Sequence, residues 1–253
     1  LLTPFSSKLH PHFWGVCGLE IRRDALKDLV FGVESGEFIF PDGAWVAVPG
    51  NARVASRQFR KEELEAGRSF KVYLGLRMPD PVRANVTVLR EPGDLVSAGT
   101  RFVAETGHEE LRDLHQAGPA APVRLMEYVI RVFTESETAN LADWSLIPVA
   151  NLEYDGASLA VSPGYVPPVV TIGASETIRQ IVQSVREQVA SHTSRLEEYK
   201  VPRDIRASDF DPGFFVFLLA LRTVNRYAPE LAQLADAPVA HPWTVYGLFG
   251  RLV

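Results

Sequence analysis

Residues 154–175 read YDGASLAVSPGYVPPVVTIGAS, and the spacing of the apolar residues changes within this stretch. Before it, apolar and polar residues alternate, which is typical of strands. After it, apolar residues recur every three or four positions, which is typical of amphipathic helices. Three prolines between residues 163 and 168 lack a backbone N–H donor and predict a stiff, extended connector. The sequence therefore predicts two domains, residues 1–168 and residues 169–253.

The strands predicted before the connector follow one another without amphipathic helices between them. Short β-branched or aromatic runs mark them at residues 16–21, 31–40, 45–48, 70–76, 84–89 and 123–133. Asp155 and Gly156 separate two further apolar alternations and predict a β-hairpin with a type I′ turn. Residues 91–120, rich in Gly, Glu and Asp, predict long exposed loops. Strands at this spacing predict an antiparallel β-sandwich.

Three helices are predicted after the connector. The first begins after Ser175, whose hydroxyl suits an N-cap position. The second begins at Asp211 and Pro212, and Pro229 is predicted to kink or break it. The third begins at His241-Pro242, and its apolar face is still in progress where the sequence stops, so we expect a further helix beyond it. The predicted fold class is α+β: an antiparallel β-sandwich followed by an α-helical bundle.

The first predicted helix carries a stripe of apolar or semi-apolar residues at a spacing of 4-3-4-3-4-3. The stripe consists of Ile178, Val182, Val185, Val189, His192, Leu196 and Tyr199. Such a pattern over three heptads is typical of a coiled-coil or bundle seam. Two interpretations stay open: contact among three copies of the chain around an axis, or packing within one chain. His192 is interpreted as a partly buried imidazole held by a neighbour rather than as a pH switch.

The composition argues against several classes of partner. The net charge is −5 and no run of five or more residues is rich in Lys and Arg, so nucleic-acid binding is not favoured. The single cysteine, Cys17, excludes an intramolecular disulfide and favours a reducing compartment such as the cytoplasm. The longest apolar run, Phe214–Leu221, is far shorter than the roughly twenty residues that cross a bilayer as a helix.

Motifs that carry chemistry are absent from the sequence. It contains no Gly-rich phosphate loop, no nucleophile elbow and no His-Glu-x-x-His zinc helix. His10 and His12 flank a proline, but no Cys, Asp or Glu stands nearby to complete a metal site. The sequence therefore predicts no catalytic residues, no metal and no cofactor.

Charged residues gather before the strand predicted at residues 70–76. The members of this group that we single out are Arg57, Arg60, Lys61, Glu62 and Glu63. A run of this kind is either a docking loop for a partner or a solvated face, and both interpretations stay open at this point.

Several motifs occur in an order that resembles a known family. They are HFWGVCGLEI at residues 12–21, FPDG at 40–43, SPGYVPPVVTIGAS at 162–175, DFDPGFFVFLLALRTVNRYAPEL at 209–231 and HPWTVYGLF at 241–249. In order and spacing they resemble the ImpJ/VasE family of type VI secretion baseplate proteins, also called TssK. The resemblance extends from about His10 to Val253.

This resemblance implies a structural adaptor without enzyme activity. It implies that residues 1–168 form the shoulder domain and residues 169–253 most of a helical bundle. It also implies a homotrimer that joins a wedge of the proteins TssF and TssG to the membrane complex of TssL and TssM. In the family a C-terminal head domain contacts TssL and TssM, and this sequence shows no counterpart of it. The implied location is the cytoplasm, at the inner face of the inner membrane.

Two alternatives come from other functional classes. The first is a β-sandwich module that binds carbohydrate or a phage-type receptor through the loops of residues 91–120. The second is a hydrolase that uses His10 or His12 with a carboxylate such as Glu20. An adaptor needs shape and surface rather than a reaction centre, and the lack of catalytic motifs therefore favours it over the hydrolase.

Overall fold

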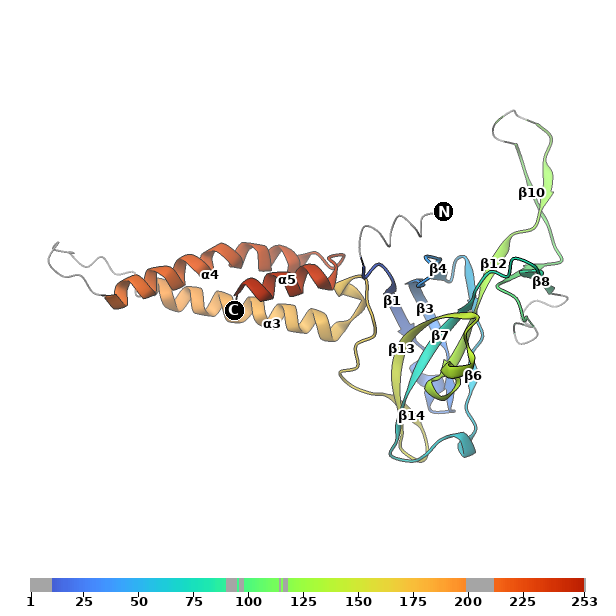
Figure 1. Cartoon of the computed structure of the whole chain (residues 1–253), viewed down its shortest axis with the longest axis horizontal. Helices are drawn as coiled ribbons and strands as arrows, with labels where there is room; N and C mark the ends of the chain where they lie inside the picture. Colours follow the sequence, from blue (N-terminus) through green and yellow to red (C-terminus); the bar gives the residue numbers. More distant parts are fainter. Residues whose placement is uncertain are drawn as a thin grey trace. The chain divides into compact units, whose positions relative to one another are not determined.

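The computed structural model (Figure 1) describes residues 11–89, 95, 98–113, 115, 118–198 and 212–252. The chain divides into two compact units, Leu1–Val170 and Thr171–Val253, which we describe separately. Strands are the main regular elements of the first unit, and helices are those of the second. The predicted α+β fold class and the change from strands to helices after the connector are therefore confirmed.

The first unit contains a three-stranded and a seven-stranded sheet. The smaller sheet is antiparallel, in the order β1 (Gly15–Ile21), β3 (Val33–Ile39) and β4 (Trp45–Val48). The larger sheet has the order β14-β13-β7-β12-β9-β8, with β5 also paired to β12. Its strands are β5 (Ala52–Val54), β7 (Ser69–Arg77), β8 (Val86–Leu89), β9 (Phe102–Glu105), β12 (Met126–Thr134), β13 (Trp144–Tyr154) and β14 (Leu159–Val161).

Shorter elements complete this unit. Two strand pairs lie outside the main sheets, β2 (Val30–Phe31) with β6 (Arg57–Gln58), and β10 (Glu109–Leu111) with β11 (Ala121–Val123). The short helices are α2 (Arg23–Leu26), η1 (Lys61–Glu63) and η2 (Glu135–Asn140). Of these, η1 contains Glu63, and η2 contains Glu135 and Glu137.

The core of the first unit is filled from both sheets. Phe38 of β3 and Val46 of β4 are fully buried, as are Leu74 of β7, Ile130 of β12 and Ile147 of β13. Alternate residues of a strand point to one face, so each sheet presents an apolar side to this core. The predicted β-sandwich is therefore confirmed.

The prediction that all strands pair antiparallel is wrong at two places. The strand β5 pairs with β12 in parallel, with Arg53 opposite Val129, and β8 pairs with β9 in parallel, with Thr87 opposite Val103. Parallel neighbours need a crossover connection rather than a tight turn, and nothing in the local apolar pattern encodes such a crossover. Residues 91–120 also contain β9 and β10, which are too short to show a clear alternation in sequence.

The last hairpin is present, but its turn differs from the predicted one. Tyr154 pairs with Leu159, so the loop contains four residues instead of two. The carboxylate of Asp155 accepts hydrogen bonds from the backbone N–H groups of Ala157, at 2.8 Å, and Ser158, at 2.7 Å. An aspartate that satisfies two backbone donors in this way replaces the type I′ geometry.

The second unit contains η3 (Ile172–Ala174), α3 (Glu176–Glu198), α4 (Pro212–Asp236) and α5 (Pro242–Leu252), with α3 and α4 lying side by side (Figure 1). The hydroxyl of Ser175 accepts a hydrogen bond from the Ile178 N–H at 3.4 Å, as its predicted N-cap role requires. The imidazole of His241 accepts one from the Trp243 N–H at 3.0 Å at the start of α5.

Pro229 was predicted to kink or break the second helix, and the break is wrong. Helix α4 continues through Pro229 to Asp236. A proline inside a helix removes one backbone hydrogen bond, but Leu231 is fully buried in the next turn and anchors the helix beyond it. Burial of the apolar face thus outweighs the local penalty of the proline.

Candidate interaction surfaces

The apolar stripe predicted on the first helix lies on α3. Val182 is buried in a cluster with Ile172 and Val245, and Ile178 packs against the same cluster. Farther along α3, Val185, Val189 and Leu196 are half-buried. The first part of the stripe therefore faces the core of its own unit.

One described member of the stripe does not follow this pattern. The prediction that His192 is partly buried is wrong, because His192 falls at the edge of the stripe and is exposed. Thr193, at the opposite edge, is half-buried and donates a hydrogen bond from its hydroxyl to the Val189 carbonyl at 2.8 Å. Tyr199 lies outside the described residues.

A patch of solvent-exposed apolar side chains lies on the N-terminal part of α4. Phe215, Val216 and Leu219 are 50%, 68% and 60% exposed, and Leu218 adjoins them at 37%. Residues three and four positions apart share one side of a helix, so these four side chains form a continuous surface. We call it the α4 patch. It could not be predicted from the sequence, because a run that is apolar on all sides does not reveal which side stays exposed.

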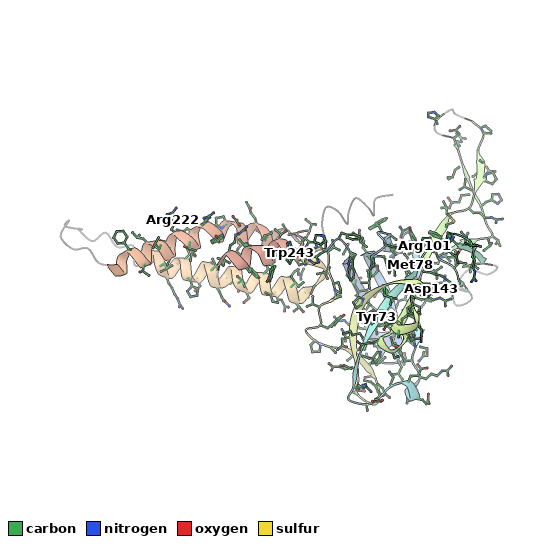
Figure 2. All side chains as sticks on the ribbon, in the orientation of Figure 1. Tyr73, Met78, Arg101, Asp143, Arg222 and Trp243 are labelled. Carbon is green, nitrogen blue, oxygen red and sulfur yellow. The ribbon has the colours of Figure 1, made fainter. Side chains whose placement is uncertain are left out.

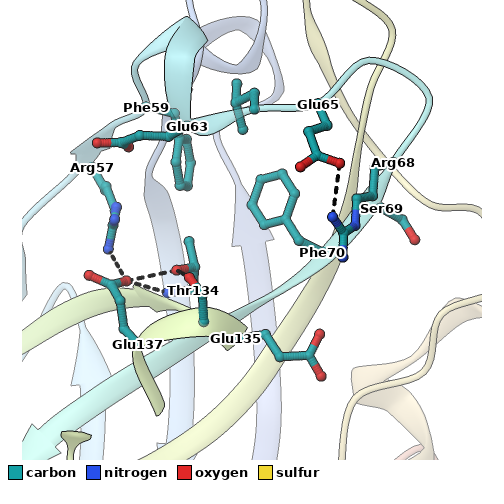
Figure 3. Close-up of a pocket in the computed structure, with 12 residues that line it drawn as sticks. Arg57, Phe59, Glu63, Glu65, Arg68, Ser69, Phe70, Thr134, Glu135 and Glu137 are labelled. Carbon is teal, nitrogen blue, oxygen red and sulfur yellow. Dashed lines mark hydrogen bonds and ion pairs between the residues drawn. The ribbon is translucent and has the colours of Figure 1, made fainter. Parts of the chain in front are cut away.

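A groove of about 680 Å³ lies in the first unit beside the predicted docking residues (Figure 3). Of that group, Arg57 and Glu63 line the groove, whereas Arg60, Lys61 and Glu62 are not among its lining residues. The complete lining is Arg57, Phe59, Glu63, Leu64, Glu65, Arg68, Ser69, Phe70, Thr134, Glu135, Ser136 and Glu137. These residues come from β6 and η1 and the segments that follow each of them, from the start of β7, and from the end of β12 with η2.

One wall of the groove is held by a network around Glu137. Its carboxylate accepts hydrogen bonds from the Thr134 N–H at 2.7 Å and the Thr134 hydroxyl at 2.9 Å. The Arg57 guanidinium donates to the same carboxylate at 2.5 Å and lies 5.3 Å from the centre of the Phe59 ring. The network closes a capping box on η2 and fixes Arg57 across the groove.

This network also sets the ionisation of Glu137. Burial would raise the pKa of this carboxyl, but the hydrogen bonds from Thr134 and Arg57 outweigh burial and hold the pKa below the ordinary value of 4.5. Because the pKa is lower in the folded chain, the ionised carboxylate stabilises the fold above pH 4.5. That contribution is lost as the pH falls through the folded pKa.

We expect the substitution Glu137→Gln to lower the free energy of unfolding at neutral pH by about 1 kcal/mol. The loss is modest because 38% of the Glu137 side chain is exposed, and solvent screens its pair with Arg57. Urea unfolding followed by tryptophan fluorescence measures it, with Glu62→Gln as an exposed control. The difference from wild type should shrink as the pH falls below 4.5; an unchanged difference in acid would contradict this account.

A family model described as "Bacterial Type VI secretion, VC_A0110, EvfL, ImpJ, VasE" matches residues 1–253. The chain belongs to this family. The resemblance inferred from the order of motifs is therefore confirmed. No curated protein sequence matches this ImpJ/VasE chain significantly.

Solved structures share the fold of this ImpJ/VasE chain. The cryo-electron microscopy structure of a type VI TssK-TssF-TssG baseplate subcomplex matches with a TM-score of 0.76 at 18% identity, covering 98% of this chain and 76% of that one. A crystal structure of TssK matches with a TM-score of 0.77 at 17% identity, covering 97% of this chain and 53% of that one. TssK from the EAEC type VI system, bound to a nanobody, matches with a TM-score of 0.77 at 18% identity, covering 99% of this chain and 80% of that one. At these identities the likeness shows the fold.

The described part of this ImpJ/VasE chain contains no group of three or more His, Cys, Asp and Glu side chains that could hold a metal ion. Burial, together with the nearby Glu37 carboxylate, raises the pKa of the Cys17 thiol to about 11, so the thiol is protonated and a poor nucleophile at neutral pH. His10 lies outside the described residues. None of the described helices combines the length and apolar character needed to cross a bilayer.

Proposed function

We propose that this chain is a structural component of a type VI secretion baseplate and has no enzyme activity. It acts as a trimeric connector that joins a wedge of TssF and TssG to the cytoplasmic side of the TssL and TssM membrane complex. The family match and the likeness to TssK within a TssK-TssF-TssG baseplate subcomplex support this role. Residues 1–168 are the shoulder domain in this proposal, and residues 169–253 belong to the helical bundle.

The α4 patch is the observation that carries the oligomeric part of this proposal. Contiguous apolar surface of this kind on a soluble domain marks a site of association. The patch is self-complementary in chemistry, since copies of it bury Phe215, Val216 and Leu219 against one another around an axis. We place the contact between copies here rather than on the α3 stripe, because Ile178 and Val182 already pack within their own unit.

We expect the wild-type chain to be trimeric and the double variant Val216→Glu/Leu219→Glu to be monomeric. Two carboxylates placed at the centre of an apolar contact lose its burial energy and add repulsion between copies, which weakens association by about 100-fold or more. Size-exclusion chromatography with light scattering, at a series of protein concentrations, measures the change.

Ile181→Glu is the matched control for this experiment. Ile181 is an apolar residue of α3 that is 50% exposed, and it lies outside the α4 patch. We expect this variant to remain trimeric. A monomeric wild type, or a trimer that survives both substitutions on α4, would contradict the proposal.

A further inference from the structure

The groove beside η1 and η2 has a charge that its own residues do not balance. Its lining contains two guanidinium groups, from Arg57 and Arg68, and four carboxylates, from Glu63, Glu65, Glu135 and Glu137. Both cations are already engaged, Arg57 with Glu137 at 2.5 Å and Arg68 with Glu65 at 2.8 Å. The excess negative charge therefore resides on Glu63 and Glu135.

These two carboxylates lie on different walls of the groove (Figure 3). Glu63 ends η1 and makes no ion pair within the part of the chain that the structure describes. Glu135 begins η2, and its only described ion pair is a long one, 3.4 Å to the Lys71 ammonium. A cation can therefore pair with either carboxylate without displacing a strong internal pair.

The groove also offers an apolar surface. The rings of Phe59 and Phe70 pack edge to face, with centroids 5.5 Å apart, and Phe70 and Leu64 are half-buried at the lining. Figure 3 shows both rings between Glu63 on one wall of the groove and Glu135 on the other. A volume of about 680 Å³ is within the range of ligand sites in proteins and accommodates a few side chains.

The groove is organised before anything binds. The capping box of η2 holds Thr134 and Glu137, and Arg57 is fixed by Glu137 and by the Val132 carbonyl at 3.2 Å. Walls held in this way lose little conformational entropy when a ligand enters, which favours binding.

We propose that this groove binds a short basic segment of a partner protein, in which two arginines or lysines flank an aliphatic residue. One cation pairs with Glu63 and the other with Glu135, and the aliphatic side chain packs on Phe70 and Leu64. A small polyamine would satisfy the carboxylates and leave the apolar surface unused, so the combination of both surfaces favours a protein segment. The inference rests on the proposed function only in taking the occupant to be a protein.

A fluorescein-labelled pentapeptide of alternating arginine and leucine is the probe. We expect fluorescence anisotropy to show saturable binding to the wild-type chain with a Kd on the order of 10–100 μM. The double variant Glu63→Gln/Glu135→Gln should bind about tenfold more weakly, because the carboxylate partners of both cations are neutralised. Replacing the leucines of the peptide with glycine should also weaken binding, and added salt should weaken it further.

The control variant is Glu62→Gln/Glu110→Gln, which changes the net charge equally at exposed positions outside the groove. It should bind the peptide as the wild type does. Equal binding by both double variants, an equal loss in both, or undiminished binding of the glycine peptide would overturn the proposal. The peptide is measured on each chain whatever its oligomeric state, so a monomeric wild type would contradict the trimer and leave this inference standing.

Discussion

Replacing Gly15 with alanine is expected to lower the free energy of unfolding by about 3 kcal/mol. Gly15 has a φ of +144°, a backbone conformation that side-chain-bearing residues rarely adopt. A Cβ atom at this position would lie 2.6 Å from the carbonyl oxygen of Pro168, so the backbone on one side must move. Strain in the dihedral and the clash with a backbone atom act together.

The clash matters because it falls where the proline-rich connector is attached to β1. The Val16 N–H donates to the Pro168 carbonyl at 2.8 Å, and the Val170 N–H donates to the Val16 carbonyl at 2.9 Å. Prolines restrict the backbone of the connector, so it has little freedom to move away from a new side chain. We therefore expect both hydrogen bonds to be weakened in the variant.

Gly18→Ala in the same strand is the matched control. A Cβ at Gly18 meets no atom within 4 Å, and its φ is not positive, so this change should be neutral to within about 0.5 kcal/mol. Guanidinium unfolding followed by tryptophan fluorescence compares the two variants on the full chain. Equal stability of Gly15→Ala and Gly18→Ala would show that the attachment at Pro168 adapts freely.

Features that depend on local periodicity were predictable from the sequence. The alternation in residues 70–76 corresponds to β7, and Ser175 and His241 stand at the starts of α3 and α5 as predicted. Each of these follows from the side-chain period or from the hydrogen-bonding capacity of one residue. Neighbouring residues suffice to specify such elements.

Features that depend on distant residues were missed. The parallel pairing of β5 with β12 joins residues far apart in the sequence, and no local pattern records it. The groove has the same character, because Glu63 and Glu135 are brought together by the pairing of β7 with β12. The sequence singled out Arg57 and Glu63 as docking candidates from charge alone, without the aromatic side chains or the second carboxylate wall.

Arg101 is the clearest residue of this kind, and it carries the second large expected effect. In sequence it is one more charged residue in a segment predicted to be an exposed loop. In the structure its side chain, labelled in Figure 2, is 7% exposed. It donates to the Asp42 carboxylate at 2.7 Å and to the Arg77 carbonyl, at the end of β7, at 2.6 Å. Its guanidinium also lies 5.3 Å from the centre of the Tyr128 ring.

We expect Arg101→Met to lower the free energy of unfolding by about 3 kcal/mol. Methionine keeps an unbranched stem, so the loss reports the missing guanidinium more than missing volume. The Asp42 carboxylate, whose side chain is 20% exposed, retains a hydrogen bond from the Ala44 N–H at 3.0 Å but loses its cation. A carboxylate left in this environment without its cation carries most of the cost.

A double-mutant cycle separates this cost from general damage to packing. Asp42→Asn removes the charge that Arg101→Met would leave behind, so the double variant should recover about 1–2 kcal/mol relative to the sum of the single changes. Arg68→Met is the surface control, since the pair of Arg68 with Glu65 is largely exposed and should contribute less than about 0.5 kcal/mol. If the losses of unfolding free energy at Arg101 and Asp42 are simply additive, the ion pair does not account for the effect of Arg101→Met. Stacking of the guanidinium on the Tyr128 ring is then the interaction to test, by Tyr128→Leu.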